Sequence, residues 1–333
     1  MDFGLTDDQR EIQRTARDLL AGRASAEVVR SHAEAGTTDA SLWRELSELG
    51  WPGIAIGEAH GGQGLGAVEL AILSEELGRS LAPVPFLPSV AAASVIEHGG
   101  SAEQAQRWLP GLASGETVGA LAMSSSDGVA ELVLGGREAG VFVLVEEDGG
   151  ARLLAREEVE LTPLQSIDPT RSAARVSAGE GAGEALAGEL DRALVAVSAE
   201  LVGVCARALE MTVAYVKERK QFGKAIGTFQ ALRHRIADLA TELECARLLT
   251  YEVAERLEQG ADPVTTRMTS MAKIKSSEVA KRIALEGMQM MGGYGYATEY
   301  DMESHVRHSL VLPIYAGTNE IQREIISGSL GLR

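Results

Sequence analysis

Residues 215–230 read YVKERKQFGKAIGTFQ and join two long stretches of helical pattern. At its start the segment has a cluster of three cations, followed by an aromatic ring and two glycines: Lys217, Arg219, Lys220, Phe222, Gly223 and Gly227. An arginine offers a planar fork that matches a pyrophosphate, and a phenylalanine offers a stacking face beside it. A basic helix end that complements the helix dipole before an ordinary turn is an equally simple alternative. The residues alone therefore leave an anion site and a plain turn both open.

The stretches around this turn have the apolar period of amphipathic helices. They cover residues 190–217, 229–259, 263–291 and 319–326. Long helices joined by short turns are typical of antiparallel bundles. We therefore expect residues 186–333 to form a C-terminal antiparallel four-helix bundle.

Residues 1–115 are also helical in pattern and are expected to form an N-terminal helical domain. Thr6 and Gln9 have the spacing of a capping box, and Gly50 followed by Pro52 ends a further predicted helix. The glycine-rich loop at 57–66, GEAHGGQGLG, indicates a close approach of the backbone to some other group.

Residues 116–185 have a different pattern. Short apolar or β-branched runs occur at 141–145 (VFVLV) and 159–161, with glycine turns at 135–136 and 148–150. A shortened middle β domain is predicted here, and residues 177–188 resemble a small-residue linker. The expected fold class is α+β, mostly α.

The net charge of the chain excludes two classes of binding partner. The 333 residues include 31 Lys and Arg against 48 Asp and Glu, a net charge of −17. Such a surface repels nucleic acid and anionic membranes, so neither is an expected partner. The acidic N-terminus is unlike a signal peptide, and we expect a soluble, cytoplasmic protein. Cys205 and Cys245 are predicted to be buried thiols, and His305 and His308 lack a third ligand, so no metal is expected.

Two more motifs follow in the C-terminal half. The first reads QMMGGYGY, in which Gly292 and Gly293 either let an anion approach the backbone or simply end a helix. The second reads IYAGTNEIQR, in which Thr318 can cap a helix that begins at Asn319 and leaves N–H groups for an anion. Each motif alone is compatible with ordinary helix termination.

Together, and in this order, the three motifs resemble the acyl-CoA dehydrogenase family. The resemblance extends to Trp51-Pro52-Gly53 and to the run at 75–79, EELGR. It implies a dimer of dimers with FAD in a cleft at the subunit interface. Members use a glutamate base to remove the α-hydrogen of an acyl-CoA thioester as a proton. The β-hydrogen passes to FAD as a hydride, and the electrons leave to an electron-transfer flavoprotein.

The resemblance also assigns the cofactor residues. Arg219 is expected to bind the flavin pyrophosphate with Phe222 beside it, while Gln289 and the two following glycines line the adenosine side. In homotetrameric relatives these residues reach across the dimer interface to the neighbour's FAD. The full set expected at the FAD is Arg219, Gln221, Phe222, Gln289, Gly292, Gly293, Thr318 and Asn319.

The chain departs from the family at the base. Most members have a Glu before the Gly-Thr of the third motif, where this chain has Ala316. Other members place the base 29 residues before the Phe of the Arg-X-X-Phe motif, and this position is Ala193. Neither alanine accepts a proton. Glu200, on the same helix face as Ala193 but about 10 Å farther along, is the remaining candidate base. The alternative for Glu200 is a buried carboxylate paired with an arginine.

The β domain departs as well. Where members have a strand that holds their own flavin, this chain has only LAMSSSD at 121–127, and a second such strand has no match. We therefore predict one subunit of a heteromeric α2β2 acyl-CoA dehydrogenase, whose second subunit supplies the base. A bulky acyl-CoA such as a steroid side-chain thioester is the expected substrate. The alternatives are a self-sufficient homo-oligomer that uses Glu200 and a flavin-free structural subunit.

Overall fold

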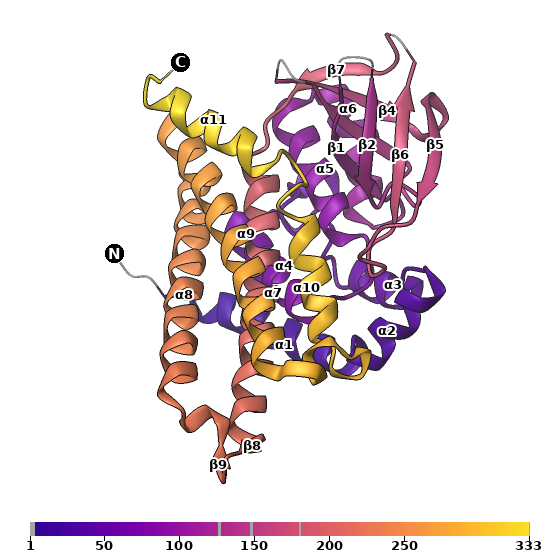
Figure 1. The fold of residues 1–333 in the computed structure, drawn as a ribbon. Helices are drawn as coiled ribbons and strands as arrows, with labels where there is room; N and C mark the ends of the chain where they lie inside the picture. Colours follow the sequence, from indigo (N-terminus) through magenta and orange to yellow (C-terminus); the bar gives the residue numbers. More distant parts are fainter. Residues whose placement is uncertain (1–3, 126–127, 147–148, 180, 333) are drawn as a thin grey trace.

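The computed structural model describes residues 4–125, 128–146, 149–179 and 181–332, so Asp127 and Asp148 of the segments quoted above lie outside the described residues. Figure 1 shows N-terminal helices, a region of short strands and a set of long C-terminal helices. The predicted fold class, α+β with mostly helix, is confirmed.

The N-terminal region is helical, and the capping box at its start is confirmed. The Thr6 hydroxyl accepts a hydrogen bond from the Gln9 N–H at 3.2 Å, and the Thr6 N–H donates to the Gln9 side chain at 2.9 Å. No helix among the described residues is both long and apolar enough to cross a membrane. The helices are α1 (Asp7–Arg23), α2 (Ala26–Ala35), α3 (Ala40–Glu48), α4 (Ala67–Ser80), α5 (Phe86–Gly99) and α6 (Ala102–Ala113).

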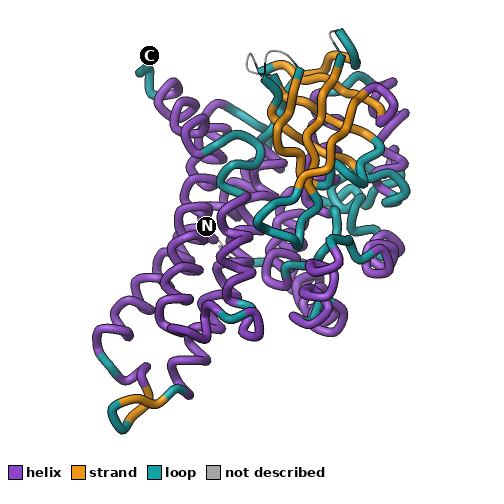
Figure 2. Tube along the Cα trace, turned by 45° about the vertical axis from the view of Figure 1, so that its right-hand side comes forward, coloured by secondary structure: helices purple, strands orange, loops and turns teal. Residues whose placement is uncertain are grey.

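The short strands form two small sheets that pack on each other (Figure 2). Phe142, Leu144 and Val176 belong to the apolar core between them. Strands β1 and β3 are parallel, and the other neighbouring pairs are antiparallel. One sheet has the order β1 (Gly119–Met123), β3 (Val141–Val145), β4 (Gly150–Ala155) and β7 (Glu184–Ala187). The other has the order β2 (Val129–Leu134), β6 (Ala173–Ala178) and β5 (Val159–Leu164).

The predicted linker over 177–188 is wrong in part. Residues Glu184–Ala187 form β7, which pairs with β4 so that Gly150 lies opposite Ala187. The sequence EALA has little strand propensity of its own, so pairing with a distant strand decides its structure. The predicted domain boundary after residue 185 falls inside this strand.

The C-terminal region consists of long helices, close to the predicted ranges. They are α7 (Asp191–Glu218), α8 (Gln230–Glu258) and α9 (Pro263–Met291), followed by the shorter α10 (Met302–Val311) and α11 (Asn319–Ser329). Helix α7 packs against α8 and α9, and α9 also packs against α10 and α11. A hairpin of β8 (Lys220–Gln221) and β9 (Lys224–Ala225) joins α7 to α8 at the end of the bundle opposite α11 (Figure 1).

Two glycines let α4 and α7 cross closely. A Cβ on Gly78 would lie 2.1 Å from the Glu200 carbonyl oxygen, and a Cβ on Gly203 would lie 1.9 Å from the Glu75 carbonyl oxygen. Any side chain at either position would therefore push the helices apart. The crossing holds Glu200 in the interior, where one apolar core extends from the N-terminal helices into the bundle.

The glycine-rich loop at 57–66 approaches the backbone that leads into it. A Cβ on Gly62 would lie 2.0 Å from the Ile56 carbonyl oxygen, so the expected close approach is to the chain itself.

Of the two cysteines, Cys205 is buried as predicted, but Cys245 is exposed. Cys245 precedes the buried Ala246 and points about 100° away from it around α8, which turns the thiol toward solvent.

Candidate functional site

The end of α7 and the hairpin that follows it carry a group of cations that have no carboxylate partner in the described part of the chain. Within the described ranges, Lys217, Arg219, Lys220 and Lys224 form no ion pair. The Lys224 ammonium instead lies 4.4 Å from the centre of the Phe229 ring. In a chain of net charge −17, such a local positive group favours an anionic ligand.

A hollow of about 570 Å³ lies beside these cations. Arg219 and Gln221 line it from the hairpin, and Gly292, Gly293 and Tyr294 line it from the end of α9. The guanidinium carbon of Arg219 lies 5.5 Å from the centre of the Tyr294 ring, a cation–π distance. The structure thus brings together four of the residues predicted at the cofactor.

The backbone turns sharply at this hollow. Gly292 ends α9 with a φ of +63°, and its N–H donates to the carbonyls of Met288 and Gln289. It is therefore a helix cap, which was one of the two interpretations of the QMMGGYGY motif. A Cβ on Gly292 or Gly293 would meet nothing within 4 Å, so the backbone faces open space that a ligand can approach. The Gln289 side chain is exposed and is not among the residues that line the hollow.

Phe222 protrudes from the hairpin turn. Its side chain is 91% exposed, and its ring meets the Phe229 ring edge-on at 6.0 Å instead of lining the hollow. Its φ of +55° is left-handed, and Gly223 follows with a φ of +80°. This backbone costs an aromatic residue about 1–2 kcal/mol. An exposed ring held in a strained turn is more typical of a binding residue than of a structural one.

Thr318 and Asn319 lie at the other end of the bundle. The Thr318 hydroxyl accepts from the Ile321 N–H, which caps α11, and the Asn319 side chain accepts from the Lys273 ammonium at 3.1 Å. Lys273 and Gly292 are nineteen residues apart on α9, a span of about 28 Å at 1.5 Å per residue. A single copy of the chain therefore does not bring Thr318 and Asn319 to the hollow.

The two positions at which the family has its base are buried alanines. Ala316 is 2% exposed and Ala193 is fully buried. The backbone at Ala316 is left-handed, with a φ of +53°. The loop around it is held by the Lys273 ammonium, which donates to the Pro313 carbonyl at 2.6 Å and the Gly317 carbonyl at 2.8 Å. Burial lowers the pKa of Lys273 to about 7. Neither alanine position supplies a proton acceptor.

Glu200 belongs to a buried polar network. Its Oε1 accepts from Arg171 at 2.5 Å and lies 2.9 Å from His308 Nε2. His308 Nδ1 lies 2.8 Å from the Asp168 carboxylate, which also accepts from the Thr170 hydroxyl at 2.6 Å. The side chains of Glu200, Asp168 and His308 are at most 1% exposed. Glu200 is therefore buried and paired with an arginine, the alternative stated for it above.

The network determines the charge of its members. Burial opposes the charge of Asp168, but its bonds to His308 and Thr170 outweigh burial and lower its pKa to about 2. Burial also opposes the charge of Glu200, yet Arg171 and His308 hold its pKa below the usual range. The two carboxylates raise the pKa of His308 in spite of its burial. A carboxylate with a lowered pKa is a poor general base, so this geometry does not favour proton abstraction by Glu200.

The sequence predicts no site role for Asp168 or Arg171, and it raises His308 only as a metal ligand without a third partner. Asp168 and Arg171 come from the loop before β6, and His308 comes from α10. The bonded residues are 29 to 140 positions apart, and one sequence has no local signal that joins such distant residues. The described residues contain no group of three or more His, Cys, Asp or Glu that could hold a metal ion.

Known proteins resemble this chain along nearly its whole length. Residues 6–116 match the acyl-CoA dehydrogenase N-terminal domain, and residues 179–331 match the acyl-CoA dehydrogenase C-terminal domain. Acyl-CoA dehydrogenase IpdE2 of Mycobacterium tuberculosis is 32% identical over 308 residues, which cover 91% of each chain. This chain belongs to the acyl-CoA dehydrogenase family. The family comprises oxidoreductases that act on CH–CH bonds, and the prediction of the family is confirmed.

Solved structures of similar proteins agree with the fold. A variant of the Tcur3481-Tcur3483 steroid ACAD is 27% identical with a TM-score of 0.88, and the match covers 98% of both chains. The FAD complex of PigA is 25% identical with a TM-score of 0.87 and full coverage of both chains. The family and the FAD-bound PigA structure support FAD as the cofactor.

Proposed function

We propose that this chain is one subunit of a heteromeric acyl-CoA dehydrogenase and that its hairpin completes the FAD site of a partner subunit. The observation that carries the proposal is an asymmetry within the chain. At one end of the bundle, cations that form no ion pair among the described residues lie beside an open hollow, which Arg219 lines. The positions of the base hold buried alanines. A chain that can bind an anionic cofactor but has no base needs a second chain that supplies one.

The proposed roles follow from the contacts. The Arg219 guanidinium binds the FAD pyrophosphate through its planar fork, because it has no competing carboxylate among the described residues. Gln221, Gly292 and Gly293 line the approach to the adenosine side, with Gln289 beside them. Phe222 is buried against the partner on assembly, which offsets the strain of its turn. FAD, when bound, supplies the acceptor for the hydride from the acyl-CoA.

We assign Thr318 and Asn319 no contact with FAD in this site. The Lys273 ammonium and the Ser277 hydroxyl already donate to the Asn319 side chain, and Thr318 caps α11. Their proposed role is to fix the conformation of the loop that contains Ala316.

The surface and the relatives support an assembly. Large apolar side chains are exposed on and beside α11, as expected of a face that another subunit covers. They include Ile314, Ile321, Leu330 and Leu332, with exposed fractions between 47% and 66%. The similarity to a steroid ACAD supports a bulky acyl-CoA as the substrate. An α2β2 arrangement that passes electrons to an electron-transfer flavoprotein fits these features.

The test is the FAD content of the complex after co-expression with the product of an adjacent open reading frame. We expect Arg219→Ala to weaken FAD retention by about tenfold or more, because a charge-assisted hydrogen bond is lost. Arg282→Ala, an exposed arginine on α9, is the matched control and should retain FAD. Unchanged FAD in the Arg219→Ala complex contradicts the proposal. A wild-type complex without FAD would instead favour a structural subunit.

A further inference from the structure

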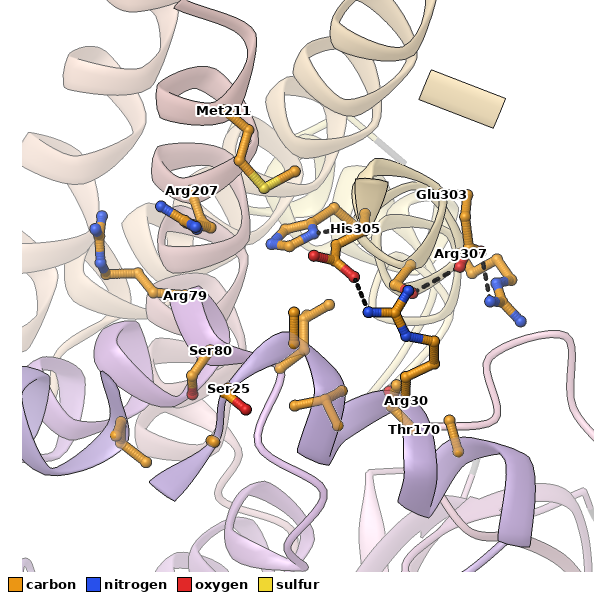
Figure 3. A pocket seen from close by; sticks show the side chains of 18 of the residues that line it. Ser25, Arg30, Arg79, Ser80, Thr170, Arg207, Met211, Glu303, His305 and Arg307 are labelled. Carbon is orange, nitrogen blue, oxygen red and sulfur yellow. Dashed lines mark hydrogen bonds and ion pairs between the residues drawn. The ribbon is translucent and has the colours of Figure 1, made fainter. Parts of the chain in front are cut away.

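Among the described residues, Arg219 contacts an aromatic ring and forms no ion pair. Its guanidinium carbon lies 5.5 Å from the centre of the Tyr294 ring. The cavity between the N-terminal helices and the bundle shows the contrasting case, because Arg307 there forms an ion pair with Glu303 (Figure 3). A carboxylate neutralises the guanidinium that it binds, whereas a ring face leaves the positive charge and the N–H donors available. Arg219 is therefore supported and still able to bind an anion.

The Tyr294 ring is itself fixed by two other rings. Its centre lies 4.9 Å from that of Tyr300, in an edge-on arrangement with 66° between the planes, and 6.1 Å from that of Tyr215. Aromatic rings at these separations attract one another beyond the effect of their burial. Tyr294 belongs to the short turn Gly292–Tyr296 after α9, whereas Tyr215 lies on α7. The ring thus joins the ends of two helices and has a defined position beside the arginine.

The Arg219 side chain needs such support, because it is long and exposed. Its backbone is already fixed, since its N–H donates to the Tyr215 carbonyl at 2.9 Å and its carbonyl accepts from the Ile226 N–H at 2.8 Å. The side chain beyond the backbone loses rotamer freedom when it binds a ligand. A ring that already restricts these rotamers lowers the entropic cost of binding. Contact with Tyr294 therefore makes Arg219 a better anion ligand than a free arginine would be.

We propose that Tyr294 is a positioning residue, whose ring holds the Arg219 guanidinium in the orientation that binds the FAD pyrophosphate. The inference rests on the proposed function, because it concerns the same cofactor site. The contribution comes from the face of the ring, so the phenol hydroxyl is not required.

The test measures the dissociation constant of FAD from the co-expressed complex by equilibrium dialysis. A cation–π contact contributes about two- to fivefold at an exposed site and more where water is excluded, so we expect Tyr294→Leu to weaken FAD binding about three- to tenfold. Tyr294→Phe keeps the ring and should bind FAD as tightly as the unmodified complex. Tyr296→Leu is the matched control, because Tyr296 lies in the same turn, is 79% exposed and does not line the hollow. This control should leave the affinity unchanged.

A double-mutant cycle separates positioning of Arg219 from direct contact with the cofactor. If Tyr294 acts through the arginine, Tyr294→Leu has no further effect once Arg219→Ala is present. A ring that stacks on FAD or only supports the turn would weaken binding by the same factor with and without Arg219→Ala, and this result would overturn the proposal.

Three other results would also overturn the role of Tyr294. These are an unchanged affinity in Tyr294→Leu, a loss in Tyr294→Phe as large as in Tyr294→Leu, and an equal loss in Tyr296→Leu. A loss of affinity in Arg219→Ala but not in Tyr294→Leu contradicts this role alone. Unchanged affinity in both variants contradicts the proposed function as well.

Discussion

At the scale of one residue, the position of Glu200 on its helix suggests a catalytic base, but its contacts indicate a structural role. Its place on α7 makes it the nearest carboxylate along the face of Ala193, but its carboxylate is bonded to Arg171 and His308. When one member of a buried ion pair is removed, the other charge remains in the interior without compensation. The residue is therefore expected to stabilise the fold and not to transfer protons.

Glu200→Gln tests this role. The variant leaves the buried Arg171 charge without its carboxylate, and we expect it to lower the free energy of unfolding by about 3–5 kcal/mol. Urea denaturation measures the change, with the exposed Glu189→Gln as a control that should stay within about 0.5 kcal/mol. A variant of unchanged stability that no longer transfers electrons from acyl-CoA to the flavin would establish Glu200 as the base.

The network should also give the protein a pH-dependent stability. The pKa of His308 is raised in the folded state, so its contribution is complete below the unfolded pKa of about 6.5 and is lost as the pH rises through the folded value. The slope reaches at most about 1.4 kcal/mol per pH unit. Asp168 acts in the opposite sense, because its contribution is present above about pH 4 and is lost as the pH falls toward 2.

Denaturation of the unmodified chain and of His308→Gln between pH 6 and 9 measures the first effect. We expect the stability difference between them to shrink as the pH rises. A difference that stays constant or grows with pH would show that His308 is neutral in the folded protein.

At the scale of elements, the crossing of α4 and α7 depends on glycine. Gly203→Ala places a Cβ where the Glu75 carbonyl now lies, and we expect a loss of about 2–3 kcal/mol. Gly22→Ala is the matched control, because Gly22 lies inside α1 with nothing within 4 Å of its Cβ position. That change should stabilise the protein by up to about 1 kcal/mol. Thermal unfolding of both variants checks the contrast, and equal shifts would contradict the close crossing.

The elements that sequence predicts well are those with local signals at both ends. Helix α9 matches its predicted range because Asp262 caps its start, Pro263 occupies the first turn and Gly292 ends it. Strand β7 is missed because its pairing with β4 is not local. The difference between local and non-local signals also explains why the hairpin was predicted and the network around Glu200 was not. The hairpin motif is readable along the chain, whereas the partners of Glu200 come from a distant loop and a distant helix.

At the scale of the whole molecule, the hairpin that we propose to bind an anionic cofactor and the loop of Ala316 lie at opposite ends of one bundle. Helix α9 runs between these two ends. Lys273 bonds to the loop of Ala316 at one end, and Gly292 lines the hollow at the other. In the proposed division of the active site, neither end is complete by itself. Under the proposed function, the hollow of this chain closes over a cofactor held by another subunit, and we expect activity to require that partner.

The flavin absorbance of the purified chain, alone and with its partner, tests this requirement most directly. We expect the chain alone to be colourless after purification in the presence of FAD, and the complex to hold oxidised flavin that an acyl-CoA bleaches. A chain that retains one FAD per copy by itself, and whose flavin is reduced by acyl-CoA without any partner, would contradict the proposed division of the active site.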